Sequence, residues 1–151
     1  LRRNKEVQMD IKKIVADLVQ KFGTRNPIEI AEKLDVLCFC ENLGTLNGYY
    51  ASAFNVQSIH VNNNLSPKRQ NVTCAHELGH VILHPGLNAC LMRNTTFMNI
   101  NKYEKQANIF ASYLLMPDEM LTDYQGYTIE EIAEIYDIPA NLLNERVPFK
   151  N

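Results

Sequence analysis

The amino-acid sequence predicts an α+β fold, in which a small three-stranded antiparallel sheet packs on a bundle of helices. Apolar residues recur at steps of three and four, the period of amphipathic helices, in residues 5–22, 68–84 and 102–116. Between residues 36 and 62 the pattern changes to short runs of β-branched and aromatic residues with turns between them. A chain of 151 residues can bury one sizeable core. We therefore expect residues 1–151 to form a single domain, with 118–151 as its C-terminal helical extension.

Charge and hydropathy exclude several classes of protein. The chain has 15 Lys and Arg against 17 Asp and Glu and no long basic run, so we expect no direct nucleic-acid partner. Its longest apolar runs, such as 109–116, are much shorter than a membrane span, so no membrane partner is expected. The charged start lacks the apolar region of a signal peptide, which predicts a cytoplasmic location. The four cysteines lack CxxC spacing and are interpreted as reduced thiols, with Cys38 and Cys40 as packing residues on one side of a strand.

The first half of the chain predicts two helices followed by the sheet. An amphipathic helix over Lys5–Phe22 ends at Gly23, and Asn26-Pro27 has the pattern of a cap that opens a short helix over Ile28–Leu34. The three strands are predicted as an antiparallel meander over Val36–Cys40, Gly48–Phe54 and Ser58–Asn62. The turns between them are expected at Asn-Leu-Gly and Asn-Val-Gln.

The second half predicts helices separated by one irregular segment. Ser66-Pro67 is a second cap with proline, opening a helix from Lys68 to about His84. Residues 86–101 are rich in Asn and Thr and are expected to form a loop, after which the helical pattern resumes over Lys102–Met116. Two short final helices are predicted over Thr128–Tyr136 and from Pro139 to about Arg146, the first opened by a capping box of Thr128 and Glu131.

The segment His76-Glu77-Leu78-Gly79-His80 matches the HExxH motif within a predicted helix. Histidines four residues apart lie one turn apart on the same face, so both rings can bind one tetrahedral ion. Glu77 is turned by about 100° from His76, which places its carboxylate beside the ion, where it can accept a proton from an attacking water. We therefore predict a zinc site with His76 and His80 as ligands and Glu77 as the base of peptide hydrolysis.

A catalytic zinc needs a third protein ligand and one open position. Glu104 is the candidate, because it opens an amphipathic segment that can pack against the HExxH helix. His84 is a rival candidate. A single ion cannot bind residues i, i+4 and i+8 of one helix, however, because the first and the last of them are about 12 Å apart along the helix axis. We interpret His84 as a helix-terminal histidine favoured by the helix dipole. Gly79 is unfavourable inside a helix, and we expect it to permit close backbone packing beneath the site.

Two blocks of sequence together resemble the ImmA/IrrE family of HExxH metallopeptidases. The first is Cys74-Ala75-His76-Glu77-Leu78-Gly79-His80-Val81-Ile82-Leu83-His84 and the second runs from Glu104 to Pro117 with the pattern ExxANxFAxxLLMP. The resemblance extends over most of the chain and implies a zincin-like fold, Glu104 as the third zinc ligand, and a repressor as substrate. Asn108, one turn after Glu104, is either a group that orients a ligand or Glu77, or a capping or packing residue.

Substrate contacts are less well defined by the sequence. Tyr50, Ser52 and His60 are candidate substrate-binding residues, because the strand that precedes the metal helix could bind an extended peptide at its edge. A donor for the oxyanion is also needed, and Tyr49, Tyr50, Tyr103 and His60 are all open alternatives for it.

The sequence thus predicts a zinc-dependent endopeptidase that cleaves a protein, specifically a helix-turn-helix repressor of a phage or integrative element. The alternative is a regulatory module that keeps zinc for stability or sensing and binds a repressor or DNA without proteolysis. Its final helices have the shape of a DNA-binding pair, but their acidic residues oppose contact with phosphates. A toxin acting on another cellular protein would use the same chemistry.

Overall fold

The computed structural model describes residues 2–87 and 97–146 and confirms the α+β class. Its helices and strands follow one another as α1 (Arg2–Phe22), α2 (Pro27–Lys33), β1 (Leu37–Glu41), β2 (Gly48–Ala53), β3 (Val56–Asn62), α3 (Pro67–Leu83), α5 (Phe97–Leu115), α6 (Asp118–Leu121), a 3-10 turn (Thr122–Tyr124), α7 (Ile129–Tyr136) and α8 (Ala140–Asn144).

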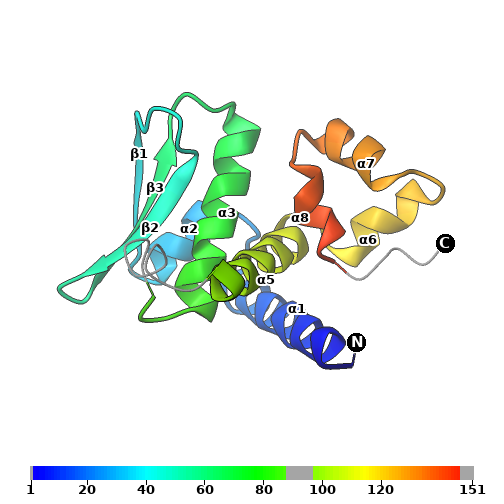
Figure 1. Ribbon diagram of the computed structural model, residues 1–151, viewed down its shortest axis with the longest axis horizontal. Helices are drawn as coiled ribbons and strands as arrows, with labels where there is room; N and C mark the ends of the chain where they lie inside the picture. Colours follow the sequence, from blue (N-terminus) through cyan, green and yellow to red (C-terminus); the bar gives the residue numbers. More distant parts are fainter. Residues whose placement is uncertain (1, 88–96, 147–151) are drawn as a thin grey trace.

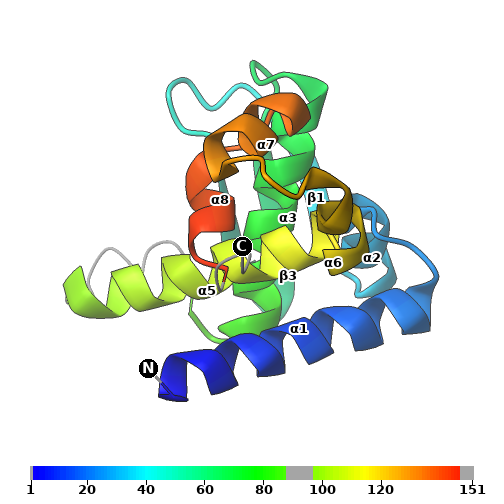
Figure 2. The same ribbon diagram turned by 90° about the vertical axis from the view of Figure 1, so that its right-hand side faces the viewer.

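Helix α3 lies at the centre of the molecule, between the sheet and α5, and α2 packs on both α3 and β1 (Figure 1). One face of the sheet packs on α3, while α5 crosses the other side of α3 and α1 lies along α5 (Figure 2). The core joins these layers through fully buried side chains such as Ile59, Leu78 and Phe110. None of the helices in the described residues is long and apolar enough to cross a membrane.

The sheet is mixed, so the predicted antiparallel meander is wrong. The strand order is β1-β3-β2, with β1 parallel to β3 and β2 antiparallel to it. The turn between β2 and β3 consists of Phe54 and Asn55, both with positive φ, one residue earlier than expected. This tight turn fixes β2 beside β3. The longer connection over residues 42–47 lets β1 take the opposite edge, a placement that strand patterns alone do not determine.

Asn62, at the end of β3, holds that wide connection in place. Its amide group is buried and donates to the carbonyl oxygens of Gly44 and Leu46 at 2.9 and 2.8 Å. Gly48 then opens β2 where no larger residue fits, because a Cβ there would lie 2.5 Å from the Thr73 side chain and 2.7 Å from the His60 carbonyl oxygen. The connection and the start of β2 are therefore pressed against α3, beside the HExxH motif.

The predicted helix boundaries are largely confirmed. Gly23 ends α1 with a φ of 70°, and the side chains of Asn26, Ser66 and Thr128 cap α2, α3 and α7, with Glu131 completing the capping box.

One helix boundary and one additional helix differ from the prediction. Helix α5 begins at Phe97, so the end of the predicted loop over 86–101 is helical, while residues 88–96 of that prediction lie outside the described residues. Asparagine disfavours a helix interior only weakly, so Asn99 and Asn101 do not prevent this extension. Helix α6 and the turn after it were not predicted.

Gly79 allows α3 and α5 to pack closely, as expected. A Cβ at this position would lie 3.1 Å from the Phe110 ring and 3.2 Å from the Ala107 Cα atom. The close approach brings the HExxH face of α3 against the residues that follow Glu104 on α5. Two helices far apart in the sequence therefore supply one site.

Candidate metal centre

His76, His80 and Glu104 converge on one point between α3 and α5. The Nε2 atoms of the two histidines are 3.2 Å apart, and the Glu104 carboxylate oxygens lie 3.0 Å from His76 and 3.1 Å from His80. Ligands bound at about 2.0–2.1 Å in a tetrahedral zinc site are separated by about 3.3 Å. These three residues thus have the donor set and the spacing of a three-ligand zinc site.

The hydrogen bond between His76 and Asn108 occupies the Nδ1 atom of His76, so its Nε2 atom is the one that can bind a cation. Asn108 Oδ1 accepts a hydrogen bond from His76 Nδ1 at 2.8 Å, which fixes one ring proton on the side away from Glu104. Without a metal ion, the Nε2 atoms of His76 and His80 and the Glu104 carboxylate could be joined by hydrogen bonds only if an imidazole took up an extra proton. That ring would then carry a positive charge next to the other ring. One divalent cation satisfies both rings and the carboxylate together.

His84 contacts the site indirectly. It caps α3 as expected of a helix-terminal histidine, yet it is buried and its Nδ1 lies 3.1 Å from His80 Nδ1. Its Nε2 donates to Gln106 Oε1 at 2.8 Å. Burial lowers the pKa of His84 below its ordinary value, which favours the neutral ring. The dipole interpretation missed both contacts, although the spacing of four residues could have indicated the first.

The two carboxylates of the site lie in different environments. Glu77 is only 8% exposed, and burial raises its pKa, although the neighbouring histidines act in the opposite direction. Burial also acts to raise the pKa of Glu104, but hydrogen bonding and positive charge at His76 and His80 outweigh it and hold that pKa well below the ordinary range. Glu104 is therefore ionised, as a ligand must be.

Of the three candidate substrate residues, only Tyr50 is brought close to the histidines. Its ring stacks on His80 with centroids 5.0 Å apart, and its buried hydroxyl has no hydrogen-bond partner among residues 2–87 and 97–146. Burial, with the charges of Glu77 and Glu104, raises the pKa of Tyr50 to about 12.

Ser52 and His60 lie farther along the sheet. Ser52 is two residues after Tyr50 on β2, so the alternation of a strand places it on the same sheet face. His60 lies on the opposite face, stacked between Phe39 and Tyr49 and hydrogen-bonded to Glu41. The structure therefore does not bring His60 to the metal ligands.

A cleft of about 580 Å³ opens beside His76 and Glu77. Its walls come from the connection before β2, from α3 and α5, and from the start of α8, through residues that include Asn47, Thr73, Asn108 and Asn141. Sequence reasoning missed the last wall, because nothing in the pattern of 139–142 indicates which element it faces. The cleft provides space for a substrate next to the candidate base.

Comparisons with known proteins agree with this geometry. Residues 31–147 match the family model Peptidase_M78, described as the IrrE N-terminal-like domain. Immunity region protein 2 of Bacillus phage phi105 is 36% identical over 135 residues, which cover 87% of this chain and 85% of the phage protein. Metallopeptidase ImmA of Bacillus subtilis (strain 168) is 35% identical over 136 residues, covering 86% of this chain and 79% of ImmA. With these matches, and with the motif residues gathered at one site, the chain belongs to the Peptidase_M78 family of IrrE N-terminal-like domains.

Proposed function

We propose that the protein is a zinc-dependent endopeptidase, with His76, His80 and Glu104 as the zinc ligands. The observation that carries the proposal is the convergence of two imidazole nitrogens and a carboxylate within hydrogen-bond distance of one another. Family membership supports a metal cofactor, and the donor set of two histidines and one glutamate favours zinc.

Glu77 is the proposed catalytic base. Zinc, when bound, would polarise the scissile carbonyl and lower the pKa of water. Glu77 neighbours both histidines along α3 and lines the cleft, so its carboxylate can accept the proton of the attacking water and deliver it to the leaving amine. Glu77 is buried, so its carboxylate interacts more strongly with nearby charges than it would in water, where such charges are screened.

Asn108 is the proposed orienting group for His76. It accepts the hydrogen bond that keeps the His76 proton on Nδ1 and the Nε2 lone pair directed at Glu104 and His80. This contact favours the orienting role over a capping or packing role for Asn108. Such outer partners of metal ligands typically change metal affinity by about 10- to 100-fold when they are removed.

The proposed substrate is a protein, specifically a helix-turn-helix repressor of a phage or integrative element, which would make this protein an anti-repressor acting in the cytoplasm. Support comes from the two relatives, one named as a phage immunity region protein and the other as a metallopeptidase. An extended segment of the substrate would enter the cleft along β2, which lies at an edge of the sheet. Tyr50 and Ser52 on this strand remain the proposed substrate contacts.

The test is to incubate the purified protein with a helix-turn-helix repressor of the phage or integrative element that encodes it. Wild-type protein with zinc is expected to yield two defined fragments, which mass spectrometry would identify, and a chelator should prevent their formation. Glu77→Gln should retain one zinc per chain while losing at least about a thousandfold in cleavage rate, because the base is removed and the ligands remain. Cleavage by Glu77→Gln at the wild-type rate would refute the mechanism.

The same preparation separates the alternative function. A regulatory module would bind the intact repressor, or bind DNA with a strong dependence on salt, and would produce no fragments. The acidic residues Glu130, Glu131 and Glu134 on α7 oppose DNA binding.

A further inference from the structure

A chain of hydrogen bonds leads from His80 away from the proposed metal position. His80 Nδ1 lies 3.1 Å from His84 Nδ1, and His84 Nε2 lies 2.8 Å from Gln106 Oε1. His80 and His84 are 2% and 5% exposed, so water does not compete freely for these contacts. The chain crosses from α3 to α5, the same two helices that supply the metal ligands.

The proton positions along this chain follow from its outer end. The carbonyl oxygen of Gln106 can only accept, so His84 carries its proton on Nε2 and presents a lone pair on Nδ1. His80 must then donate from its own Nδ1, which leaves the lone pair on its Nε2. That is the nitrogen that lies 3.2 Å from His76 Nε2 and 3.1 Å from Glu104.

The opposite orientation of the Gln106 amide would reverse the chain. Its NH₂ group would donate to His84 Nε2, His84 would donate from Nδ1, and His80 would hold its proton on Nε2, where no metal could bind. Only one arrangement of the three side chains is therefore compatible with metal binding at His80.

We propose that His84 and Gln106 are positioning residues that hold His80 in the tautomer and ring orientation required of a metal ligand. The proposal rests on the proposed zinc site and adds two residues to it. His76 is oriented by a single contact with Asn108, whereas His80 is oriented by two side chains in series, because its ring is buried and Gln106 of α5 reaches its Nδ1 through His84.

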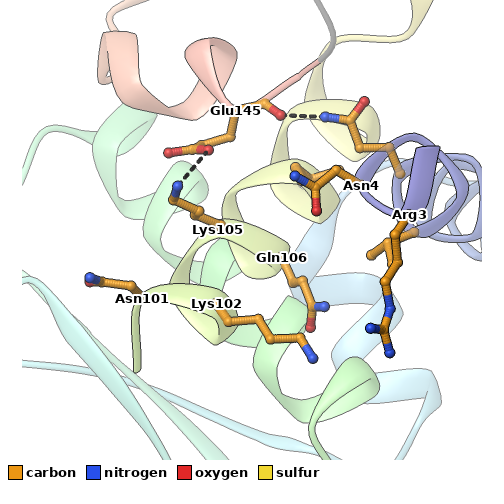
Figure 3. Close-up of a pocket in the computed structure, with 10 residues that line it drawn as sticks. Arg3, Asn4, Asn101, Lys102, Lys105, Gln106 and Glu145 are labelled. Carbon is orange, nitrogen blue, oxygen red and sulfur yellow. Dashed lines mark hydrogen bonds and ion pairs between the residues drawn. The ribbon is translucent and has the colours of Figure 1, made fainter. Parts of the chain in front are cut away.

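Gln106 is a better residue to substitute than His84, because it lies at the surface end of this series of hydrogen bonds. Its side chain lines an open pocket between α1 and α5, together with Arg3 and Lys102 (Figure 3). Substitution there leaves the buried histidines and their packing in place. Lys102 lines the same pocket from the same helix but belongs to none of these hydrogen bonds, so it provides a matched control.

Three variants separate the role of the acceptor from that of side-chain bulk. Gln106→Leu removes the hydrogen-bond acceptor, and Gln106→Glu retains an acceptor as a carboxylate. Lys102→Leu introduces the same apolar side chain at a position that takes no part in these hydrogen bonds. Zinc affinity would be measured by competition with a chromophoric chelator. We expect Gln106→Leu to weaken zinc binding by about 10- to 100-fold, and Gln106→Glu and Lys102→Leu to bind as tightly as wild type. The melting temperature of each zinc-free variant verifies folding.

A second readout observes the tautomers directly. Imidazole ¹⁵N shifts of the zinc-free protein should show His84 protonated on Nε2 in wild type and in Gln106→Glu, and should lose this preference in Gln106→Leu. Wild-type zinc affinity in Gln106→Leu, or equal weakening in the Leu and Glu variants, would contradict the proposal. His80→Ala distinguishes this failure from a failure of the metal site, because zinc binding unchanged in His80→Ala would disprove the site itself.

Discussion

The Tyr50 hydroxyl is buried beside the proposed metal ligands and has no hydrogen-bond partner in the described part of the chain. Burying such a group is typically unfavourable by about 1–3 kcal/mol. Its ring, in contrast, packs in the core and stacks on His80. The two parts of this side chain should therefore affect stability in different ways.

We predict that Tyr50→Phe keeps the melting temperature of the protein at or above that of wild type and keeps its zinc affinity. The variant retains the stacked ring and loses no hydrogen bond within the protein. Tyr50→Ala is the comparison, and should destabilise the fold by about 3–5 kcal/mol through loss of a buried aromatic ring. A drop of several degrees in the melting temperature of Tyr50→Phe would show that the hydroxyl has a partner in solution.

At the scale of single residues, the sequence identified the groups whose spacing along one helix determines their geometry. His76, Glu77 and His80 follow from the HExxH pattern, and Glu104 was chosen because it opens the apolar helical pattern of the next segment, although α5 itself begins at Phe97. The role of His84 depends on Gln106, and that contact depends on how α5 is rotated against α3. Helix rotation is set by packing, here including the close contact at Gly79, so the sequence did not show it.

At the scale of elements, Arg146 connects the end of the described chain to α5 and α6. Its buried guanidinium donates to the carbonyl oxygens of Ser112 and Met116, pairs with Asp118 and lies 4.0 Å from the centre of the Tyr113 ring. Asp118 also pairs with Lys12 of α1 at 2.5 Å. The Asp118 carboxylate thus links α1 and α6 with Arg146, two residues after the end of α8.

Asp118→Asn should lower the free energy of unfolding at pH 7 by about 1 kcal/mol, a value discounted because the Asp118 side chain is 48% exposed. Burial opposes ionisation of Asp118, but hydrogen bonds from Lys12 and Arg146 lower its pKa below the ordinary value. A lowered pKa in the folded state gives stability that is present above pH of about 4 and lost as the pH falls through the folded pKa. The difference between variant and wild type should therefore shrink below about pH 4.

Urea unfolding at several pH values measures this difference. Asp17→Asn is the control, because within the described residues Asp17 pairs with the exposed Lys13 on the same helix, and its loss should change the unfolding free energy by at most about 0.5 kcal/mol. A difference for Asp118→Asn that stays constant from pH 7 to pH 3 would contradict the linkage.

The elements themselves were predicted better than their arrangement. Proline, glycine and capping residues mark where helices begin and end, and these signals are local. Whether β1 pairs with β2 or with β3 depends on the course of residues 42–47, which Asn62 holds through buried hydrogen bonds. Those hydrogen bonds join the end of β3 to the connection before β2, and they leave no periodic signal in the sequence.

At the scale of the whole molecule, the cleft joins segments from both halves of the chain. Residues 45–48 form one wall and Pro139, Asn141 and Leu142 contribute another, and His76 and Glu77 of α3 and Asn108 of α5 also line the cleft. The C-terminal helices thus help to shape the substrate site. The sequence predicted those helices but not this contribution, because the contact between α8 and the cleft depends on long-range packing.

Asn141→Trp should obstruct substrate binding without releasing zinc. Asn141 is exposed on α8 and lines the cleft, so an indole ring there occupies space near His76 and Glu77. We expect KM for the protein substrate to rise by at least about tenfold, which corresponds to about 1.4 kcal/mol of lost binding. Asn144→Trp, at an exposed position of the same helix that does not line the cleft, is the control. Equal kinetics for the two variants would show that substrate does not use this cleft.

The most direct test of the proposed zinc site is the location of the metal itself. Crystals of the zinc-loaded protein, measured on both sides of the zinc absorption edge, should give one strong anomalous peak between α3 and α5, bound by His76 Nε2, His80 Nε2 and Glu104 at about 2.0–2.2 Å. A zinc peak at another position, or a peak bound by the two histidines without Glu104, would contradict the site described here.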